Sequence, residues 1–265
     1  MKLEEVKVGF IGFGNMAQAM ADGFIRTGAL KPEQMYACAK NQEKLRANTE
    51  VRGMNACRDA KETAEASDLV VLAVKPYMIE EVTRPVQEEL KHKIVVSVAA
   101  GYPFERLEKD LLPETHHLSI CPNTPVAVGA GIIVCEERHS LTEEEFAGVR
   151  ALFEKIALVE VVDTEHLGLA GTVCGCTPAY AAMFIEALGD AGVKHGLPRA
   201  QAYRLAAQML VGTGKLQLET GQHPGVMKDA VCSPGGTTII GVASLERSGF
   251  RSAVIDAIDA IQNRK

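Results

Sequence analysis

Short apolar runs recur along the first part of the chain, separated by stretches of mixed polarity. They are rich in valine, isoleucine and leucine, which is typical of strands that a parallel sheet buries on both faces. The clearest are Val6–Ile11, Met35–Ala39, Asp68–Pro76 and Lys93–Gly101, and weaker ones follow at His117–Cys121, Ile132–Cys135 and Leu158–Val162.

The stretches between the first runs have apolar residues at helical spacing. Asn15–Thr27 is one of them and ends at Gly28, and Gln42–Val51 is another. Strands that alternate with helices indicate a parallel sheet covered by helices on both faces, as in a doubly wound α/β domain.

The pattern changes after Asp163. Long helical stretches follow at His166–His195 and Pro198–Glu219, and then two shorter ones. We therefore predict an α/β domain over residues 1–163 and an all-helical domain over residues 164–265.

Charge and cysteine content narrow the classes of function. The chain has 28 Lys and Arg against 34 Asp and Glu, a net charge of −6 and no basic cluster, which argues against nucleic acid as a partner. The N-terminal MKLEEVKVGF has acids where a secretory signal would be basic, and its apolar run is too short for a membrane span. Seven cysteines without paired spacing favour a reducing, cytoplasmic setting.

The first apolar run leads into the motif G-x-G-x-x-A and then into a helix. Gly12 permits a tight turn, Gly14 lets the backbone approach a pyrophosphate, and Ala17 allows the helix to pack closely on the strand. The amides at the helix N-terminus would receive the phosphates. A glycine-rich turn that only connects two elements is the alternative, but the strand before and the helix after the motif favour a dinucleotide site.

The end of the second predicted strand bears on the choice of nucleotide. Enzymes that bind a free ribose 2′-hydroxyl usually have an Asp or Glu there, about 20 residues after the glycines. Here Cys38–Asn41 (CAKN) has no acid, and Glu33 lies before the strand. Lys40, with Lys44 behind it, would suit a 2′-phosphate, unless Lys40 is only a solvated surface residue. We therefore expect NADP(H) to be preferred, with NAD(H) left open.

A second glycine-rich segment lies near the other end of the chain. Ser233–Thr238 (SPGGTT) precedes an apolar helical stretch. Hydroxyls and free amides gathered at a helix N-terminus form a receptor for a small carboxylate. An ordinary helix cap is the alternative, although two glycines and three hydroxyls exceed what a cap requires.

Six motifs are spread over essentially the whole chain: GFIGFGNMA, LAVKP (Leu72–Pro76), SVAAG (Ser97–Gly101), PNTP (Pro122–Pro125), GVKHGLP (Gly192–Pro198) and, most specifically, VCSPGGTTI. Together they resemble the pyrroline-5-carboxylate reductase family. The resemblance implies a Rossmann-type N-terminal domain followed by an all-helical C-terminal dimerisation domain, with homodimers that often assemble into a decamer.

The family reaction transfers a hydride from C4 of the nicotinamide to the imine carbon of 1-pyrroline-5-carboxylate and gives L-proline, the last step of proline biosynthesis. By resemblance, Ser233, Gly236 and Thr237 hold the substrate carboxylate. Thr238 reaches the ring nitrogen, first as a positioning residue and as the best candidate for a proton relay. The implied cofactor-binding residues are Gly12, Phe13, Gly14, Asn15, Met16, Ala39, Lys40, Asn41, Val74, Lys75 and Ala100.

Other reactive side chains have simpler explanations. Lys75 follows a buried run; it is either a catalytic base or, more simply, a charge that helps to bind the cofactor or the substrate anion. His195 is expected on a helix surface. The spacing of Cys174 and Cys176 does not match metal ligands, so we expect no metal site.

Some positions depart from the family pattern. The common S-G-S-G-P-A-Y is C-G-C-T-P-A-Y here, from Cys174 to Tyr180, and cysteine donates hydrogen bonds more weakly than serine. Ala60 and Ala39 stand where many relatives have an Asn and a Ser that contact the cofactor.

Rival functions therefore stay open. One is a related NAD(P)-dependent hydroxyacid dehydrogenase. Lys194 would take the place of the catalytic lysine of those enzymes, but Pro198 stands where they have an asparagine four residues later. Another cyclic-imine reductase is a second rival, and a non-catalytic NAD(P)-binding regulator is a third.

Overall fold

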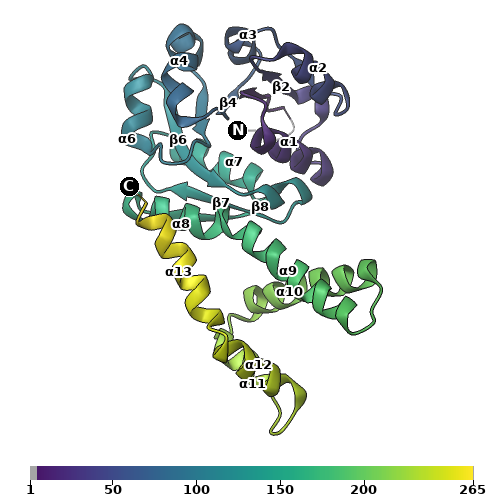
Figure 1. The fold of residues 1–265 in the computed structure, drawn as a ribbon. Coiled ribbons are helices and arrows are strands. Elements are labelled where there is room, and N and C mark those ends of the chain that lie inside the picture. Colours follow the sequence, from purple (N-terminus) through teal and green to yellow (C-terminus); the bar gives the residue numbers. More distant parts are fainter. Residues whose placement is uncertain (1–4, 265) are drawn as a thin grey trace. The chain divides into compact units, whose positions relative to one another are not determined.

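The structure is a computed structural model that describes residues 5–264. It divides into two compact units, one that reaches to Pro178 and one that begins at Ala179. Among the described residues, all strands belong to the first unit, and the second unit is helical (Figure 1).

The first unit is built on an eight-stranded sheet with the order β3-β2-β1-β4-β5-β6-β7-β8. Its first six strands pair in parallel and have the 3-2-1-4-5-6 order of a doubly wound fold, which confirms the predicted fold class. The strands are β1 (Val8–Ile11), β2 (Met35–Cys38), β3 (Asn55–Ala56), β4 (Leu69–Leu72), β5 (Ile94–Ser97), β6 (His116–Pro122), β7 (Gly131–Glu136) and β8 (Ala157–Val162).

The central strands are buried on both faces, and their side chains alternate between two cores. In β4, Leu69 and Val71 belong to one core and Val70 and Leu72 to the other. This alternation follows from the two-residue period of a strand and explains why these runs are apolar without interruption.

Helices cover both faces of this sheet. Those of the first unit are α1 (Asn15–Thr27), α2 (Gln42–Glu50), α3 (Ala60–Glu65), α4 (Ile79–Thr83), α5 (Gln87–Leu90), α6 (Phe104–Leu107), α7 (Glu143–Phe153) and α8 (Thr164–Gly175). Helix α1 has the predicted bounds, because Gly28 ends it in the left-handed conformation, at φ +68°. Its buried Met20 and Phe24 pack into the same core as Leu69 and Val71.

The sheet reverses direction after β6, which the sequence pattern did not predict. Strand β7 runs antiparallel to β6, and β8 runs parallel to β7. The connection between β6 and β7 holds only the short 3₁₀ turn η5 (Thr124–Val128), which ends at Gly129 with φ +72°. A parallel crossover needs roughly a dozen residues or more, so this short connection returns the chain in the opposite direction.

Helix α8 and the helices of the second unit make up the rest of the chain. After α8 come α9 (Thr177–Lys194), α10 (Arg199–Thr220), α11 (Pro224–Ala230), α12 (Thr237–Arg247) and α13 (Phe250–Gln262). The sequence pattern predicted one helix over His166–His195 and only two short ones at the end. Both expectations were wrong in detail, since Cys176 separates α8 from α9 and three short helices follow α10.

Pro178 explains the break between α8 and α9. A proline has no N–H to donate to the carbonyl four residues earlier, which here is that of Cys174. The side chain of Asn123 supplies the missing donor, with Nδ2 3.1 Å from the Cys174 oxygen. Helix α8 itself packs on β6 and β7 within the first unit.

Candidate functional site

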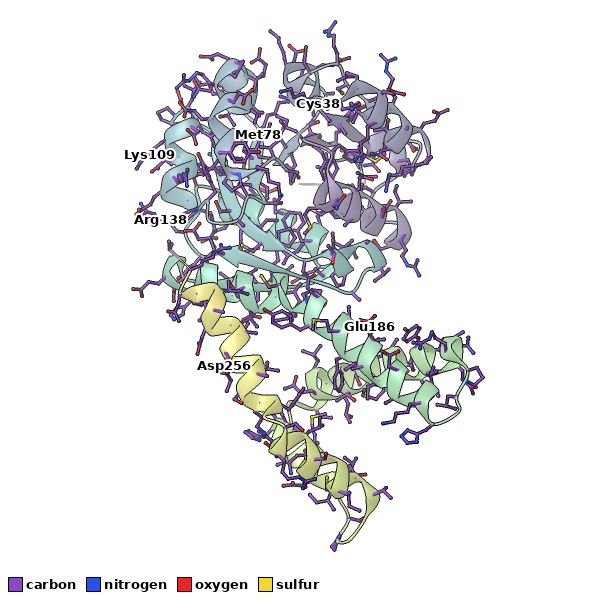
Figure 2. The ribbon with its side chains drawn as sticks, viewed as in Figure 1. Cys38, Met78, Lys109, Arg138, Glu186 and Asp256 are labelled. Carbon is purple, nitrogen blue, oxygen red and sulfur yellow. The ribbon has the colours of Figure 1, made fainter. Side chains whose placement is uncertain are left out.

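A cavity of about 590 Å³ opens at the carboxyl edge of the parallel strands, where the chain leaves β1 and β4. This is the point at which the strand order of a doubly wound sheet reverses, the usual place for a ligand. Met78, labelled in Figure 2, belongs to its lining. The full lining is Gly14, Asn15, Met16, Ala73, Val74, Lys75, Pro76, Met78, Val98, Ala99, Ala100 and Thr124.

Six of the predicted cofactor-binding residues share this cavity. They come from three separate segments, the turn after β1, the end of β4 and the end of β5, and are Gly14, Asn15, Met16, Val74, Lys75 and Ala100. Gly12, Phe13, Ala39, Lys40 and Asn41 are not among its lining residues.

Gly12 and Gly14 are glycines for different physical reasons. Gly12 has φ +92°, and a Cβ there would lie 2.7 Å from the Ala73 carbonyl oxygen, so the turn itself requires glycine. A Cβ on Gly14 would meet nothing within 4 Å, and the residue has ordinary extended angles of φ −82° and ψ −169°. Protein packing therefore does not explain Gly14, whereas a ligand lying against its backbone would.

The N-terminus of α1, where Gly14 is the N-cap, faces the same cavity. Within residues 5–264, no side chain caps this helix, and its first turn contains no acid. The amides and the helix dipole there are suited to an anion such as a pyrophosphate. Ala17 is fully buried, as close packing of helix on strand requires. The residues present thus fit a dinucleotide.

Phe13 and Asn41 have structural roles of their own. The Phe13 ring is 5% exposed and lies 5.9 Å from that of Phe10, so only its backbone remains at the turn. Asn41 caps α2 by accepting a hydrogen bond from the Lys44 amide at 2.9 Å. Ala39 is half-buried and Lys40 exposed at the carboxyl end of β2, whose last residue Cys38 accepts a hydrogen bond from the Gly12 amide.

Polar contacts anchor the segment that follows the cavity-lining residues Val98–Ala100 after β5. The backbone oxygen of Tyr102 accepts a hydrogen bond from Ser119 Oγ at 2.8 Å, and the Tyr102 hydroxyl contacts Asp110. Burial, then the Asp110 contact, raises the pKa of Tyr102 to about 12, so this hydroxyl stays protonated. The Phe104 amide donates to the fully buried Glu136, which also accepts from Thr164 in α8. These anchors were not predicted, because nothing local in the sequence marks them.

Lys75 is exposed at the mouth of the cavity. Cys121 and Cys135 are poor nucleophiles. Burial raises the pKa of the Cys121 thiol to about 11 and that of Cys135 to about 12, which disfavours their thiolates at neutral pH. Among the described residues, no three His, Cys, Asp or Glu side chains are grouped as metal ligands.

The predicted substrate residues belong to the second unit: Ser233 and Gly236 lie in the loop that leads into α12, and Thr237 and Thr238 are the first residues of that helix. Gly236 is the N-cap of this helix; a Cβ there would lie 2.4 Å from Ser233 Oγ, which a rotation of the serine side chain can relieve, and 3.1 Å from the Ser233 backbone oxygen. Gly235 has φ +68°. Ser233, Thr237 and Thr238 are exposed, and in the part of the chain that the structure describes no side chain caps α12.

Comparisons with known proteins agree with this arrangement. Residues 164–265 match the family model for pyrroline-5-carboxylate reductase dimerisation, and residues 7–101 match that for coenzyme F420-dependent NADP oxidoreductases. The pyrroline-5-carboxylate reductase of Treponema pallidum is 48% identical over 96% of this chain and 98% of its own length. That of Escherichia coli is 42% identical over 96% of this chain and 95% of its own length.

Solved structures give the same result. The crystal structure of a Plasmodium falciparum pyrroline carboxylate reductase with NADP bound superposes with a TM-score of 0.87 at 29% identity, covering 98% of this chain and 96% of that chain. The resemblance inferred from the sequence motifs is confirmed. The chain belongs to the pyrroline-5-carboxylate reductase family of NAD(P)H-dependent oxidoreductases.

Proposed function

We propose that this protein reduces 1-pyrroline-5-carboxylate to L-proline, with NADPH as its preferred reductant. The observation that carries the proposal is the open space over Gly14, at the mouth of a cavity of about 590 Å³ beside an uncapped helix N-terminus. That space would accommodate the pyrophosphate of the cofactor against the Gly14 backbone.

The residues of the first unit bind and orient the cofactor. A bound nicotinamide cofactor supplies the hydride that the imine carbon receives. The α1 N-terminus holds the pyrophosphate, and the apolar wall formed by Val74, Val98 and Ala100 excludes water from the ring. Lys75 contributes a positive charge at the cavity mouth, which favours an anionic ligand.

The residues at the N-terminus of α12 bind the substrate. The first amides of α12, with Ser233 and Thr237, accommodate the carboxylate, because an uncapped helix N-terminus without an acid favours an anion. The Thr238 hydroxyl positions the ring nitrogen and holds its proton. A protonated imine accepts hydride readily, so no strong acid is required from the protein.

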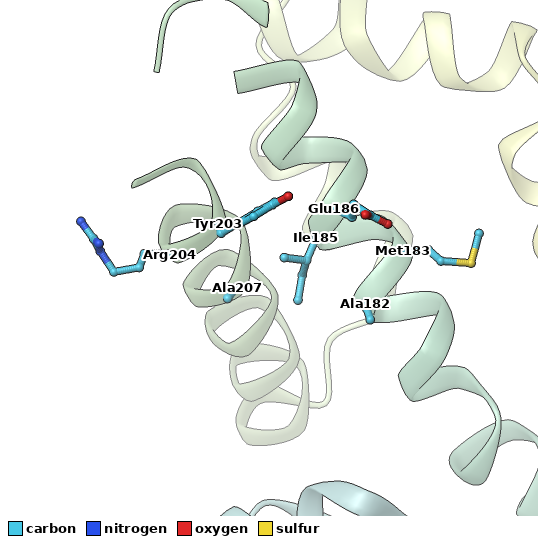
Figure 3. A pocket seen from close by; sticks show the side chains of 7 residues that line it. All are labelled: Ala182, Met183, Ile185, Glu186, Tyr203, Arg204 and Ala207. Atoms are coloured by element: carbon cyan, nitrogen blue, oxygen red, sulfur yellow. The ribbon is translucent and has the colours of Figure 1, made fainter. Parts of the chain in front are cut away.

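We further propose that residues 164–265 form the dimerisation domain, which joins two copies of the chain. The resulting dimers assemble into a decamer. Its helices expose large apolar side chains that a monomer would leave in water, such as Met183 at 67%, Leu218 at 69% and Ile240 at 65% exposed. Between α9 and α10 lies a groove of about 620 Å³, with Ile185, Tyr203 and Ala207 between the two helices (Figure 3).

A second copy explains this surface better than a lipid bilayer does. By length and composition alone, Thr164–Lys194 is apolar enough to cross a membrane. However, α8 packs on β6 and β7, and the stretch is broken at Cys176. A reducing compartment such as the cytoplasm suits the seven cysteines, all of which are free thiols in the structure.

Turnover of the purified protein tests the proposal. NADPH and NADH oxidation is followed with 1-pyrroline-5-carboxylate in the wild type, in Thr238→Ala and in Thr238→Ser, with the exposed Ser252→Ala as the control. We expect proline as the product and kcat/KM lower by about tenfold or more in Thr238→Ala, with the serine variant and the control near wild type. Absence of turnover with both cofactors would overturn the proposal and favour the regulator or the hydroxyacid dehydrogenase.

A further inference from the structure

Two loops are tied together at the edge of the sheet beside the nucleotide cavity. Strands β2 and β3 pair in parallel, with Ala37 opposite Ala56, so the residues that follow each strand emerge next to one another. The side chain of Gln42 bridges them, since its Nε2 donates to the Ala39 oxygen at 2.9 Å and to the Arg58 oxygen at 3.1 Å. Arg58 is thereby held beside the loop that contains Lys40.

The acids of the second loop are already engaged. Asp59 caps α3 by accepting a hydrogen bond from the Glu62 amide at 2.9 Å, and this bond helps to hold the pKa of Asp59 below its usual range. Glu62 in turn accepts from the Arg58 amide at 2.7 Å. Both carboxylates are therefore partly occupied by backbone amides, and neither stands at the carboxyl end of β2, where an NAD-specific acid is expected.

The guanidinium of Arg58, by contrast, is available. Its side chain is 82% exposed, and its contact with Asp59 is long, with Nε 3.4 Å from Oδ2. Because such an exposed ion pair contributes little to stability, the Arg58 side chain can break its contact with Asp59 with little loss of free energy. Lys40 and Lys44 are exposed on the neighbouring loop and helix, with Glu43 between them in the first turn of α2.

We propose that Arg58 is a specificity residue for the 2′-phosphate of NADP(H), acting together with Lys40, and that Gln42 positions it. A guanidinium can donate two parallel hydrogen bonds to a phosphate, which a lysine cannot do. The inference rests on the proposed function for the existence of the nucleotide site. It adds a residue from the β3–α3 loop, two positions before Ala60, where the family pattern places a cofactor contact that this chain lacks.

Binding of nucleotide fragments tests the inference without turnover. The full chain is titrated by calorimetry with adenosine 2′,5′-bisphosphate and with 5′-AMP, which differ only in the 2′-phosphate. We expect Arg58→Ala to weaken binding of the bisphosphate about tenfold and that of 5′-AMP by less than about twofold. Arg58→Lys should recover part of the loss. Gln42→Met, which removes the bridge but keeps the volume, should weaken only the bisphosphate. Lys109→Ala, which removes an exposed charge elsewhere in the first unit, is the control.

The outcomes separate the two proposals. If Arg58→Ala keeps the wild-type preference for the bisphosphate, or loses affinity equally for both ligands, the specificity role of Arg58 is overturned. The cofactor site itself would still stand. A wild-type protein that binds neither fragment nor NADPH would overturn the proposed function itself. A thermal unfolding scan of each variant checks that the exposed substitutions leave the fold unchanged.

Discussion

Asn123 Nδ2 donates a hydrogen bond of 3.1 Å to the carbonyl oxygen of Cys174, and its Oδ1 accepts one of 2.8 Å from the Ile132 amide. Asn123 is only 5% exposed, so water cannot replace these bonds. We predict that Asn123→Ala lowers the free energy of unfolding by about 2 kcal/mol, because two backbone groups lose their partner. Asn123→Asp keeps the acceptor for Ile132 but repels the Cys174 oxygen.

Urea unfolding measures this loss, with the exposed Asn263→Ala as the matched control. If the free energy of unfolding of Asn123→Ala falls by less than about 0.5 kcal/mol, the two hydrogen bonds of Asn123 do not stabilise the fold. Pro178 alone would then account for the break between α8 and α9.

Gly12 and Gly14 should separate folding from nucleotide binding. Gly12→Ala places a Cβ 2.7 Å from a backbone oxygen at φ +92°, so we expect a loss of roughly 3 kcal/mol or more in stability. Gly14→Ala meets no protein atom within 4 Å and should cost less than about 1 kcal/mol, as a poorer helix cap. It should nevertheless weaken NADPH binding at least about tenfold. Fluorescence titration and urea unfolding give the two quantities, and normal NADPH affinity in Gly14→Ala would place the pyrophosphate elsewhere.

His117 should make the fold less stable in mild acid. Its ring is 3% exposed, stacks on Phe104 with centroids 4.4 Å apart, and leaves Nε2 without a partner among the described residues. Burial lowers the pKa of His117 in the folded protein, although its contact with the Thr115 oxygen opposes the shift. As the pH falls through about 6.5, His117 is therefore protonated in the unfolded chain but stays neutral in the folded chain.

The free energy of unfolding should accordingly fall by up to about 1.4 kcal/mol per pH unit below that point, until the folded pKa is reached. Unfolding at about pH 7.5 and about pH 5.5 measures the effect. His117→Phe keeps the stacked ring and should show a smaller difference between the two pH values. An equal difference in both proteins would assign the acid sensitivity to other groups.

The apolar surface of the second unit should decide the oligomeric state. Leu218→Glu and Met183→Glu place a charge at positions that are 69% and 67% exposed in a single chain. If a second copy covers them, sedimentation should show dissociation towards monomers, since a buried unpaired charge is costly. Val51→Glu, at an 80% exposed apolar position of the first unit, is the control. Unchanged assemblies in both second-unit variants would place the interface elsewhere.

The sequence predicted well whatever depends on neighbouring residues. The bounds of α1 followed from apolar spacing and Gly28, and the dinucleotide site predicted from Gly12 and Gly14 lies where the structure has its cavity, at the turn between β1 and α1. It predicted poorly what depends on contacts between distant segments. Neither the Asn123 bond that replaces a missing amide at Pro178 nor the approach of Arg58 to the Ala39 loop leaves a local pattern.

The boundary between the domains shows the same dependence. Helical spacing begins near Thr164, and the sequence therefore placed the whole segment after Asp163 in one domain. Yet Leu167 and Cys174 of α8 pack with Val134 of β7. The periodicity indicated helical structure there but contained no information about which compact unit α8 packs against, so the predicted domain boundary at Asp163 stays a prediction.

The short connection between β6 and β7 also determines where the chain can be cut. A helix in this connection would have covered one face of β6 and β7. Because the connection has no such helix, α8 covers that face instead. A fragment that ended at residue 163 would leave Val134 and its apolar neighbours Cys121 and Ile132 in contact with water and should aggregate. A fragment that ended at Pro178 would retain its own cover and should stay dispersed, although both would have lost the helices from Ala179 onward.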